Sequence, residues 1–169
     1  MLLKQVRMRA LADAPYAFGG PETLVREQSL PDSYWHELAR ELAGEVPEWR
    51  DRCVSYLILD GDAVCATASS VVCNRIAHRA YFNAAWVDPR YRRRGLGSWL
   101  VREASVWATA RGCDHMRLWV DDANPAAAEF YRALGFGFTG ETKPVTPESA
   151  LAEHSMEVRL APGIKRTSG

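Results

Sequence analysis

Apolar residues at the start of the chain recur every three to four positions, which is typical of a helix with one buried face. Leu3, Val6, Ala10 and Leu11 follow this spacing until Pro15 interrupts it. We therefore expect the chain to open directly with a helix.

A second helix is predicted after a loop that contains residues 19–21. Asp32 or Ser33 can cap its first turn, Trp35 lies on its apolar face, and Gly44 follows its end. The first 50 residues thus predict two helices.

The pattern then changes to alternating and continuous apolar residues, which predict strands. Residues 54–59 and 63–73 flank the turn at residues 60–62 (Asp-Gly-Asp) and predict a hairpin, and residues 80–87 predict the next strand. We expect these three strands to be antiparallel neighbours.

A long amphipathic helix and a short buried strand come next. Residues 95–111 carry an apolar stripe that ends before Gly112, and residues 116–120 are mostly apolar. A crossover of this length places the strands that end at Val87 and Val120 parallel to each other.

The last part of the chain predicts one more helix and a closing pair of strands. Asn124 caps the helix, Pro125 is its first residue and Gly135 follows its end, while residues 136–138 and 155–160 can form the strands. The predicted fold class is α/β with a mixed sheet, antiparallel first and parallel in the middle, flanked by about four helices.

Length and composition favour one domain. A chain of 169 residues with 47% apolar composition can fill one core but is too short for two ordinary domains. We expect residues 1–161 to form that domain and residues 162–169 to be a disordered tail.

Charge and cysteine spacing argue against several classes of protein. The 21 basic and 21 acidic residues balance, so no global field directs the chain to nucleic acid or to an anionic membrane. No apolar run approaches the roughly 20 residues that span a bilayer. The four cysteines lack C-x-x-C spacing, which argues against a metal site and favours reduced, buried thiols in a cytoplasmic protein.

The arginines concentrate at one junction in the sequence. Arg90, Arg92, Arg93 and Arg94 lie between a buried strand and a long helix, and residues 95–98 (Gly-Leu-Gly-Ser) follow. The first N–H groups of a helix lack partners within it, and arginines beside them can bind phosphate oxygens. The junction therefore predicts a site for a pyrophosphate.

Other phosphate-binding motifs fit this junction poorly. The third glycine of a dinucleotide fingerprint would fall at Leu100, and the chain has no Gly-Lys-Ser/Thr of a Walker loop. The remaining alternative is that Gly95 only turns the chain and the arginines form a solvated face.

Two motifs flank the short buried strand. Residues 92–97 read Arg-Arg-Arg-Gly-Leu-Gly. The second motif comprises Asn124, Ala128, Phe130-Tyr131 and Leu134-Gly135-Phe136. Together they resemble the Gln/Arg-x-x-Gly-x-Gly/Ala signature and the downstream pattern of the GNAT superfamily of N-acetyltransferases.

The resemblance implies acetyl-CoA as co-substrate and no metal. It places the CoA pyrophosphate at Arg92, Arg94, Gly95, Leu96, Gly97 and Ser98. It also implies that the Val87 backbone bonds the pantetheine amides and that the Ala85 N–H polarises the thioester carbonyl. Asn124 would contact the pantetheine or cysteamine region as well as cap its helix.

The implied reaction is direct attack of an amine on the thioester, which needs no covalent enzyme intermediate. We expect Tyr131 to be the general acid that protonates the departing thiolate, although an aromatic residue in a helix also suits the core. The predicted function is an N-acetyltransferase that transfers an acetyl group from acetyl-CoA to a primary amine.

The sequence departs from the family pattern at two places. Tyr81 replaces a glutamate that several members carry on this strand, so the general base is unassigned and Asp121, Asp122 and Glu22 are candidates. The strand that usually precedes the first helix is expected to be absent or vestigial, because only two residues precede the helical pattern.

The acceptor is expected to be a small-molecule amine, because net charge is zero and the chain lacks a long peptide-binding insertion. The resemblance implies an acceptor pocket lined by the first two helices, their loop and residues 139–154, which contain the residues that could receive a cationic amine: Glu22, Glu27, Trp35, Glu141 and Glu153. Two alternatives stay open: acetylation of a protein lysine or N-terminus, and a non-catalytic module that binds acyl-CoA as a regulatory ligand. The resemblance also suggests a homodimer.

Overall fold

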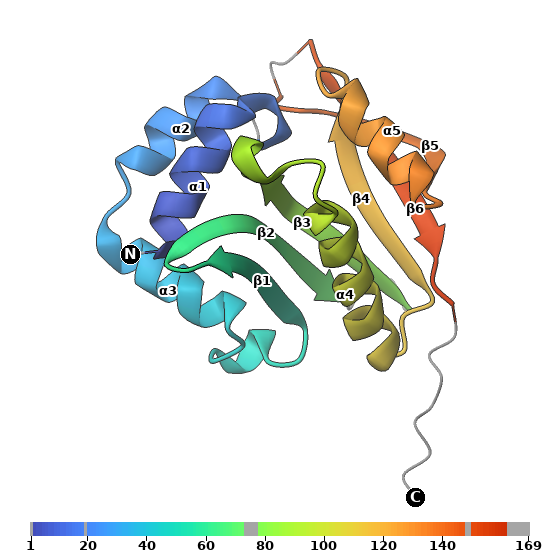
Figure 1. Ribbon diagram of the computed structural model, residues 1–169, viewed down its shortest axis with the longest axis horizontal. Coiled ribbons are helices and arrows are strands. Elements are labelled where there is room, and N and C mark those ends of the chain that lie inside the picture. The colour runs from blue at the N-terminus through green and yellow to red at the C-terminus, as the bar shows by residue number, and fades with distance from the viewer. Residues whose placement is uncertain (1, 19, 73–77, 148–149, 162–169) are drawn as a thin grey trace, which may run out of the picture.

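A computed structural model describes residues 2–18, 20–72, 78–147 and 150–161 of the chain. Within these residues the protein forms one six-stranded sheet. The N-terminal helices lie beside its first two strands, and a later helix packs over its middle strands (Figure 1). The expected tail at residues 162–169 and the end of the second predicted strand at Cys73 lie outside the described residues.

Three α-helices precede the sheet, α1 (Leu2–Asp13), α2 (Pro21–Gln28) and α3 (Asp32–Leu42), and a 3-10 helix follows α1 at Pro15–Phe18. The expected apolar face of α1 is confirmed, since its buried residues belong to the predicted stripe. The helix α2 was not predicted. It has eight residues and buries only Thr23, so it leaves no apolar periodicity in the sequence.

The strand order in the sheet is β1-β2-β3-β4-β6-β5. The strands are β1 (Cys53–Asp60), β2 (Ala63–Val72), β3 (Arg79–Val87), β4 (His115–Asp121), β5 (Gly137–Pro144) and β6 (Ala152–Arg159). Only β3 and β4 are parallel, and every other neighbouring pair is antiparallel. The predicted mixed sheet and its parallel middle are confirmed.

The apolar pattern of the sequence predicted one edge of the sheet correctly and the other only in part. In the described residues no strand precedes α1 and β1 is an edge strand, in agreement with the expected absence of a first strand. At the other edge β5 continues to Pro144, six residues beyond its predicted end, because pairing with β6 stabilises a polar and exposed segment.

Two helices pack against the main core. The helix α4 (Leu96–Ala110) crosses from β3 to β4 and lies on β2 and β3, and α5 (Pro125–Ala133) connects β4 to β5 (Figure 1). The buried residues of α4 are Leu100, Val101, Ala104 and Ala108. Trp99 was predicted on this stripe but is 42% exposed. In the part of the chain that is described, no helix is both long and apolar enough to cross a membrane.

Candidate functional site

The turn from β3 into α4 presents backbone N–H groups that lack partners within the helix. Gly95 is the N-cap, with φ 82°, a left-handed conformation that glycine adopts without strain, and it offers no side-chain cap. The first backbone bond of the helix runs from Trp99 N to Gly95 O at 3.0 Å. The N–H groups of residues 96–98 precede that bond, so they are placed to bind an anion.

Asp88 stabilises this turn through hydrogen bonds to two arginines. Its side chain is buried at 5% exposure. It accepts hydrogen bonds from the Arg90 backbone N at 2.9 Å, from Arg90 Nη2 at 3.0 Å and from Arg9 of α1. One carboxylate therefore fixes the course of the chain between β3 and α4 and joins it to α1.

Replacing Asp88 with Ala should destabilise the fold by about 2 kcal/mol. Breaking a buried ion pair costs more than this when the partner stays buried, but Arg9 and Arg90 are 38% and 70% exposed and can regain water. The midpoint of urea unfolding measures the change. Glu129→Ala, which removes an exposed carboxylate from α5, is the control and should shift the midpoint little.

The four arginines of the cluster have different partners. Arg90 is bound to Asp88, and Arg92 donates to the Val87 carbonyl oxygen through Nε at 3.0 Å and to Asp13 through Nη2. Among the described residues no ion pair involves Arg93 or Arg94. The Arg94 guanidinium lies 5.2 Å from the centre of the Tyr91 ring.

These contacts show which guanidinium groups of the cluster already have partners in the protein. Arg92 was expected at the pyrophosphate, but in this structure its guanidinium ties the turn to the end of α1. Arg94 keeps its cationic group available for a phosphate. The Val87 carbonyl oxygen already accepts one bond from Arg92, and its second lone pair leaves the expected bond to a pantetheine amide open.

Gly97 is the point at which the two sequence motifs meet. A Cβ atom added there would lie 3.0 Å from Cζ of Phe130 on α5. A hydrogen at this position therefore lets the first turn of α4 approach α5 closely.

The parallel strands β3 and β4 pair only at their beginnings. The register joins residues 79–81 to residues 115–117, and no pairing continues beyond it. Farther along β3, two residues lie opposite Ala68 of β2, which makes a β-bulge at Ala84 and Ala85. Ala84 has φ 51°, a strained conformation for a residue with a side chain, and such strain is often found at functional sites.

A cavity of about 180 Å³ opens where the two strands separate, and we call it the β3–β4 cavity. Its lining includes both bulge residues and the end of β4. The residues that line it are Ala17, Phe18, Phe82, Asn83, Ala84, Ala85, Leu118, Trp119, Val120, Asp121, Asn124, Ala127, Tyr131, Lys143 and Glu153. Nothing in the amino-acid pattern indicated that Phe18, Trp119 and Lys143 would line it.

Tyr131 of α5 lines the β3–β4 cavity and is 9% exposed. Its ring packs against Phe82, Phe130 and Phe136, at centroid distances of 6.4, 5.0 and 5.6 Å. Burial raises the pKa of its hydroxyl well above the ordinary value. The hydroxyl is thus protonated at neutral pH and can donate a proton.

Asn124 combines a structural contact with a place in the cavity. Its Oδ1 accepts a hydrogen bond from Ala127 N at 3.1 Å, which is the predicted helix cap. It also lines the β3–β4 cavity. The expected contact with pantetheine is compatible with this geometry.

The three candidate bases occupy different environments. Asp121 lines the β3–β4 cavity and is 5% exposed, while Asp122 is exposed and lies 2.6 Å from His154 Nε2. Glu22 is exposed in the first turn of α2, and it is not one of the cavity residues. The geometry therefore brings only Asp121 together with Tyr131.

Most of the carboxylates expected to receive the acceptor are used elsewhere. Glu27 accepts two bonds of 2.8 Å from Arg7, and Glu141 lies 2.5 Å from Arg117. Glu153 lines the β3–β4 cavity and pairs with Lys143 at 2.9 Å. Trp35 is buried at 1% exposure and does not line the cavity.

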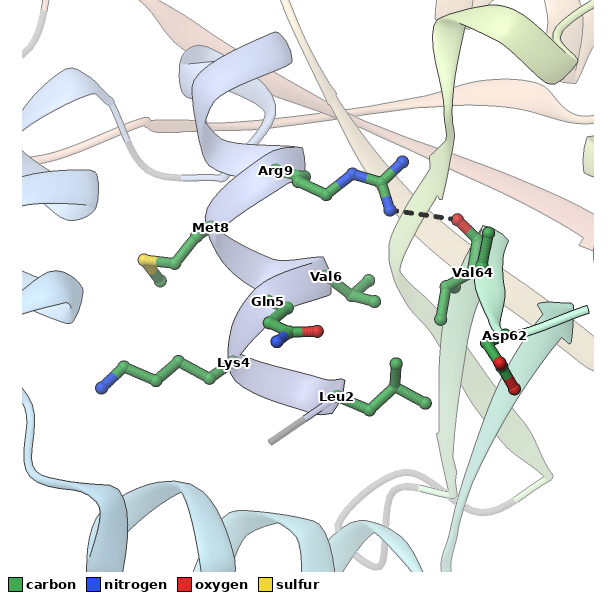
Figure 2. A pocket seen from close by; sticks show the side chains of 9 residues that line it. Leu2, Lys4, Gln5, Val6, Met8, Arg9, Asp62 and Val64 are labelled. Carbon is green, nitrogen blue, oxygen red and sulfur yellow. Dashed lines mark hydrogen bonds between the residues drawn. The ribbon is translucent and has the colours of Figure 1, made fainter.

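A larger hollow of about 570 Å³ lies between α1 and the β1–β2 hairpin. Figure 2 shows Leu2 and Val6 of α1 directed toward Val64, with Arg9 Nη1 donating to the Val64 carbonyl oxygen at 3.2 Å. The hollow is mainly apolar, and its cations Lys4 and Arg9 pair with carboxylates elsewhere. It offers no group suited to acyl transfer.

The described residues contain no group of three or more His, Cys, Asp or Glu side chains that could hold a metal ion. Cys53, Cys65 and Cys113 are buried free thiols. Burial raises the pKa of Cys53 and Cys113, so these two thiols are poor nucleophiles at neutral pH.

Comparison with known proteins agrees with this geometry. Residues 22–136 match the model of the acetyltransferase (GNAT) family. A stretch of 55 residues is 38% identical to thialysine N-epsilon-acetyltransferase of Bos taurus and covers 32% of each protein. A stretch of 97 residues is 32% identical to N-alpha-acetyltransferase 30 of Xenopus laevis and covers 54% of this chain and 33% of that protein. The chain spans about a third or less of the length of the curated relatives it matches.

The fold is shared with solved acetyltransferase structures. An aminoglycoside 6'-N-acetyltransferase complexed with coenzyme A superposes with a TM-score of 0.55 at 16% identity, over 66% of this chain and 75% of that chain. At this identity the similarity concerns the fold alone.

Proposed function

Because this chain belongs to the GNAT acetyltransferase family, we propose that it transfers an acetyl group from acetyl-CoA to a primary amine of a small molecule. The observation that carries the proposal is the buried Tyr131, which lines a cavity between two diverging parallel strands. The relative that acetylates thialysine supports a small acceptor.

The chain offers groups that fit acetyl-CoA at both ends of the site. The N–H groups of residues 96–98, which have no acceptor within the helix, suit the pyrophosphate, and Arg94 adds a cation beside them. Val87 and Asn124 lie toward the pantetheine arm. The bulge at Ala85 supplies a backbone N–H for the thioester carbonyl.

Tyr131 acts as the general acid in this proposal. The thioester supplies an activated acetyl group, and the amine nitrogen attacks its carbonyl carbon directly. The Tyr131 hydroxyl, which carries its proton at neutral pH, then protonates the departing thiolate. No thiol or hydroxyl nucleophile of the protein is needed.

Release of CoA thiol, followed with a thiol reagent, tests the proposal. The purified chain is given acetyl-CoA with a panel of small primary amines, peptides with a free N-terminus, and lysine peptides blocked at the N-terminus. We expect release with a small amine. The N-alpha-acetyltransferase relative makes peptide N-termini the second candidate. Release of CoA only with the peptides that have a free N-terminus would favour that acceptor. Tight binding of acetyl-CoA with no release for any amine would instead favour a regulatory module.

A further inference from the structure

Asp121 is a buried carboxylate without a hydrogen-bonding partner. It ends β4, is 5% exposed and lines the β3–β4 cavity together with Tyr131. Neither of its oxygens accepts a hydrogen bond from any described residue. A buried charged group left in this state is costly to the fold, which points to a ligand that supplies the missing partner.

The other charged groups around Asp121 already have partners. Glu153 lies opposite it on β6 and pairs with Lys143 at 2.9 Å, and Asp122 lies 2.6 Å from His154 Nε2. Tyr131 is the titratable residue that faces the cavity from α5. Within the described residues, therefore, no cation neutralises Asp121.

The surroundings of Asp121 favour its protonated form more than water does. Burial is the main cause that raises its pKa, and the negative charges of Glu153 and Asp122 add to it. The N–H groups of Ala123 and Asn124 oppose this shift without making hydrogen bonds of normal geometry to the carboxylate. A carboxylate with a raised pKa is a better proton acceptor near neutral pH.

We propose that the Asp121 carboxylate binds the ammonium group of the acceptor and removes its proton before the acetyl group is transferred. This inference rests on the proposed function and identifies the acceptor as a primary alkylamine that arrives as a cation. The carboxylate supplies the single negative charge that such a group needs, and Phe18 and Ala127 supply apolar walls for a slender aliphatic stem.

Asp121 takes one proton from the ammonium and leaves a neutral amine. The amine nitrogen forms a bond to the carbonyl carbon while the carbon–sulfur bond breaks. Tyr131 gives its hydroxyl proton to the sulfur and regains one from the acylated nitrogen. The proton on Asp121 is finally released to water.

Asp121→Asn tests the inference, with Asp122→Asn as the matched control at the neighbouring carboxylate. An alkylamine with a pKa near 10 is neutral in only about one molecule in a thousand at pH 7. Loss of the proton acceptor should therefore lower kcat/KM for an alkylamine about 100-fold at pH 7. The affinity for acetyl-CoA should be unchanged, and Asp122→Asn should retain wild-type turnover.

A second substrate separates proton removal from a structural effect. An alkoxyamine is weakly basic and already neutral at pH 7, so Asp121→Asn should affect its acetylation far less. In the variant the rate with the alkylamine should also keep rising with pH up to the pKa of the amine itself, because only the fraction that is already neutral can react. Equal losses for both amines, or a rate and profile like those of the wild type, would overturn the inference. Failure of the wild type to release CoA with any amine would instead overturn the proposed function.

Thermal melting shows whether the variant is folded and gives an independent readout. The pKa of Asp121 is higher in the folded than in the unfolded state, so its contribution to stability falls as pH rises through that interval. Asp121→Asn should therefore melt above the wild type at pH 8, and the difference should shrink as the pH falls towards the ordinary pKa of an aspartate. If the variant melts below the wild type at pH 8, the Asp121 carboxylate is not an unpaired buried charge that destabilises the fold.

Discussion

Ser98→Glu should weaken the binding of acetyl-CoA at least 100-fold without unfolding the protein. Ser98 is exposed in the first turn of α4, where the N–H groups of residues 96–98 lack acceptors within the helix. A carboxylate in the first turn interacts favourably with the helix dipole, so the variant should fold normally. It would compete for the same N–H groups and repel the pyrophosphate. Each charge-assisted hydrogen bond lost costs about 1.5–3 kcal/mol, so losing two accounts for the effect.

Isothermal titration calorimetry with acetyl-CoA measures the change in affinity. Ser33→Glu is the matched control, because Ser33 is also exposed in the first turn of a helix, α3. The two variants carry the same net charge, and only the one at residue 98 should lose affinity. If Ser98→Glu binds acetyl-CoA within threefold of the wild type, the pyrophosphate does not lie at this turn. Gly97→Glu is a poorer test, since its side chain would also collide with Phe130.

Tyr131→Phe should lower kcat about 100- to 1,000-fold while the affinity for acetyl-CoA stays the same. The substitution keeps the ring that packs against Phe82, Phe130 and Phe136 and removes only the hydroxyl. Without that hydroxyl the thiolate must leave unprotonated or take its proton from water. Loss of a positioned general acid is worth about two to four orders of magnitude in rate.

Steady-state turnover with the best amine, combined with calorimetry, separates the two effects. Tyr56→Phe is the control, because the Tyr56 hydroxyl is buried in β1 and lies outside the β3–β4 cavity. It should leave kcat unchanged. Parallel losses of turnover and of acetyl-CoA affinity in Tyr131→Phe would show that the hydroxyl supports the shape of the site, and unchanged turnover would exclude the acid role.

The middle of the fold could be predicted because apolar periodicity and turn residues in this part of the sequence indicate the same elements. The hairpin of β1 and β2, the crossover through α4 and the cap at Asn124 each combine apolar periodicity with a turn residue that has one clear use. The helix α2 and most of β5 could not be predicted, since their side chains are largely exposed. Tertiary contacts and strand pairing, rather than apolar spacing, determine these two elements.

The candidate site was predictable in its backbone but not in its side-chain partners. Two motifs located the turn at Gly95 and the residue Tyr131. Nothing in the sequence shows that Arg92 would bond to Asp13, which lies 79 positions earlier. Asp121 was one of three candidate bases, and only burial and the absence of a partner among the described residues distinguish it.

The close approach of α4 to α5 limits how this site can change in evolution. Position 97 can accept a side chain only if the ring at position 130 becomes smaller or moves, because the two would otherwise overlap. Substitutions at these positions should therefore occur together in related sequences. The two motifs are far apart in the chain, but they pack against each other through positions 97 and 130. A change in the phosphate-binding turn should therefore also affect the position of the helix that carries Tyr131.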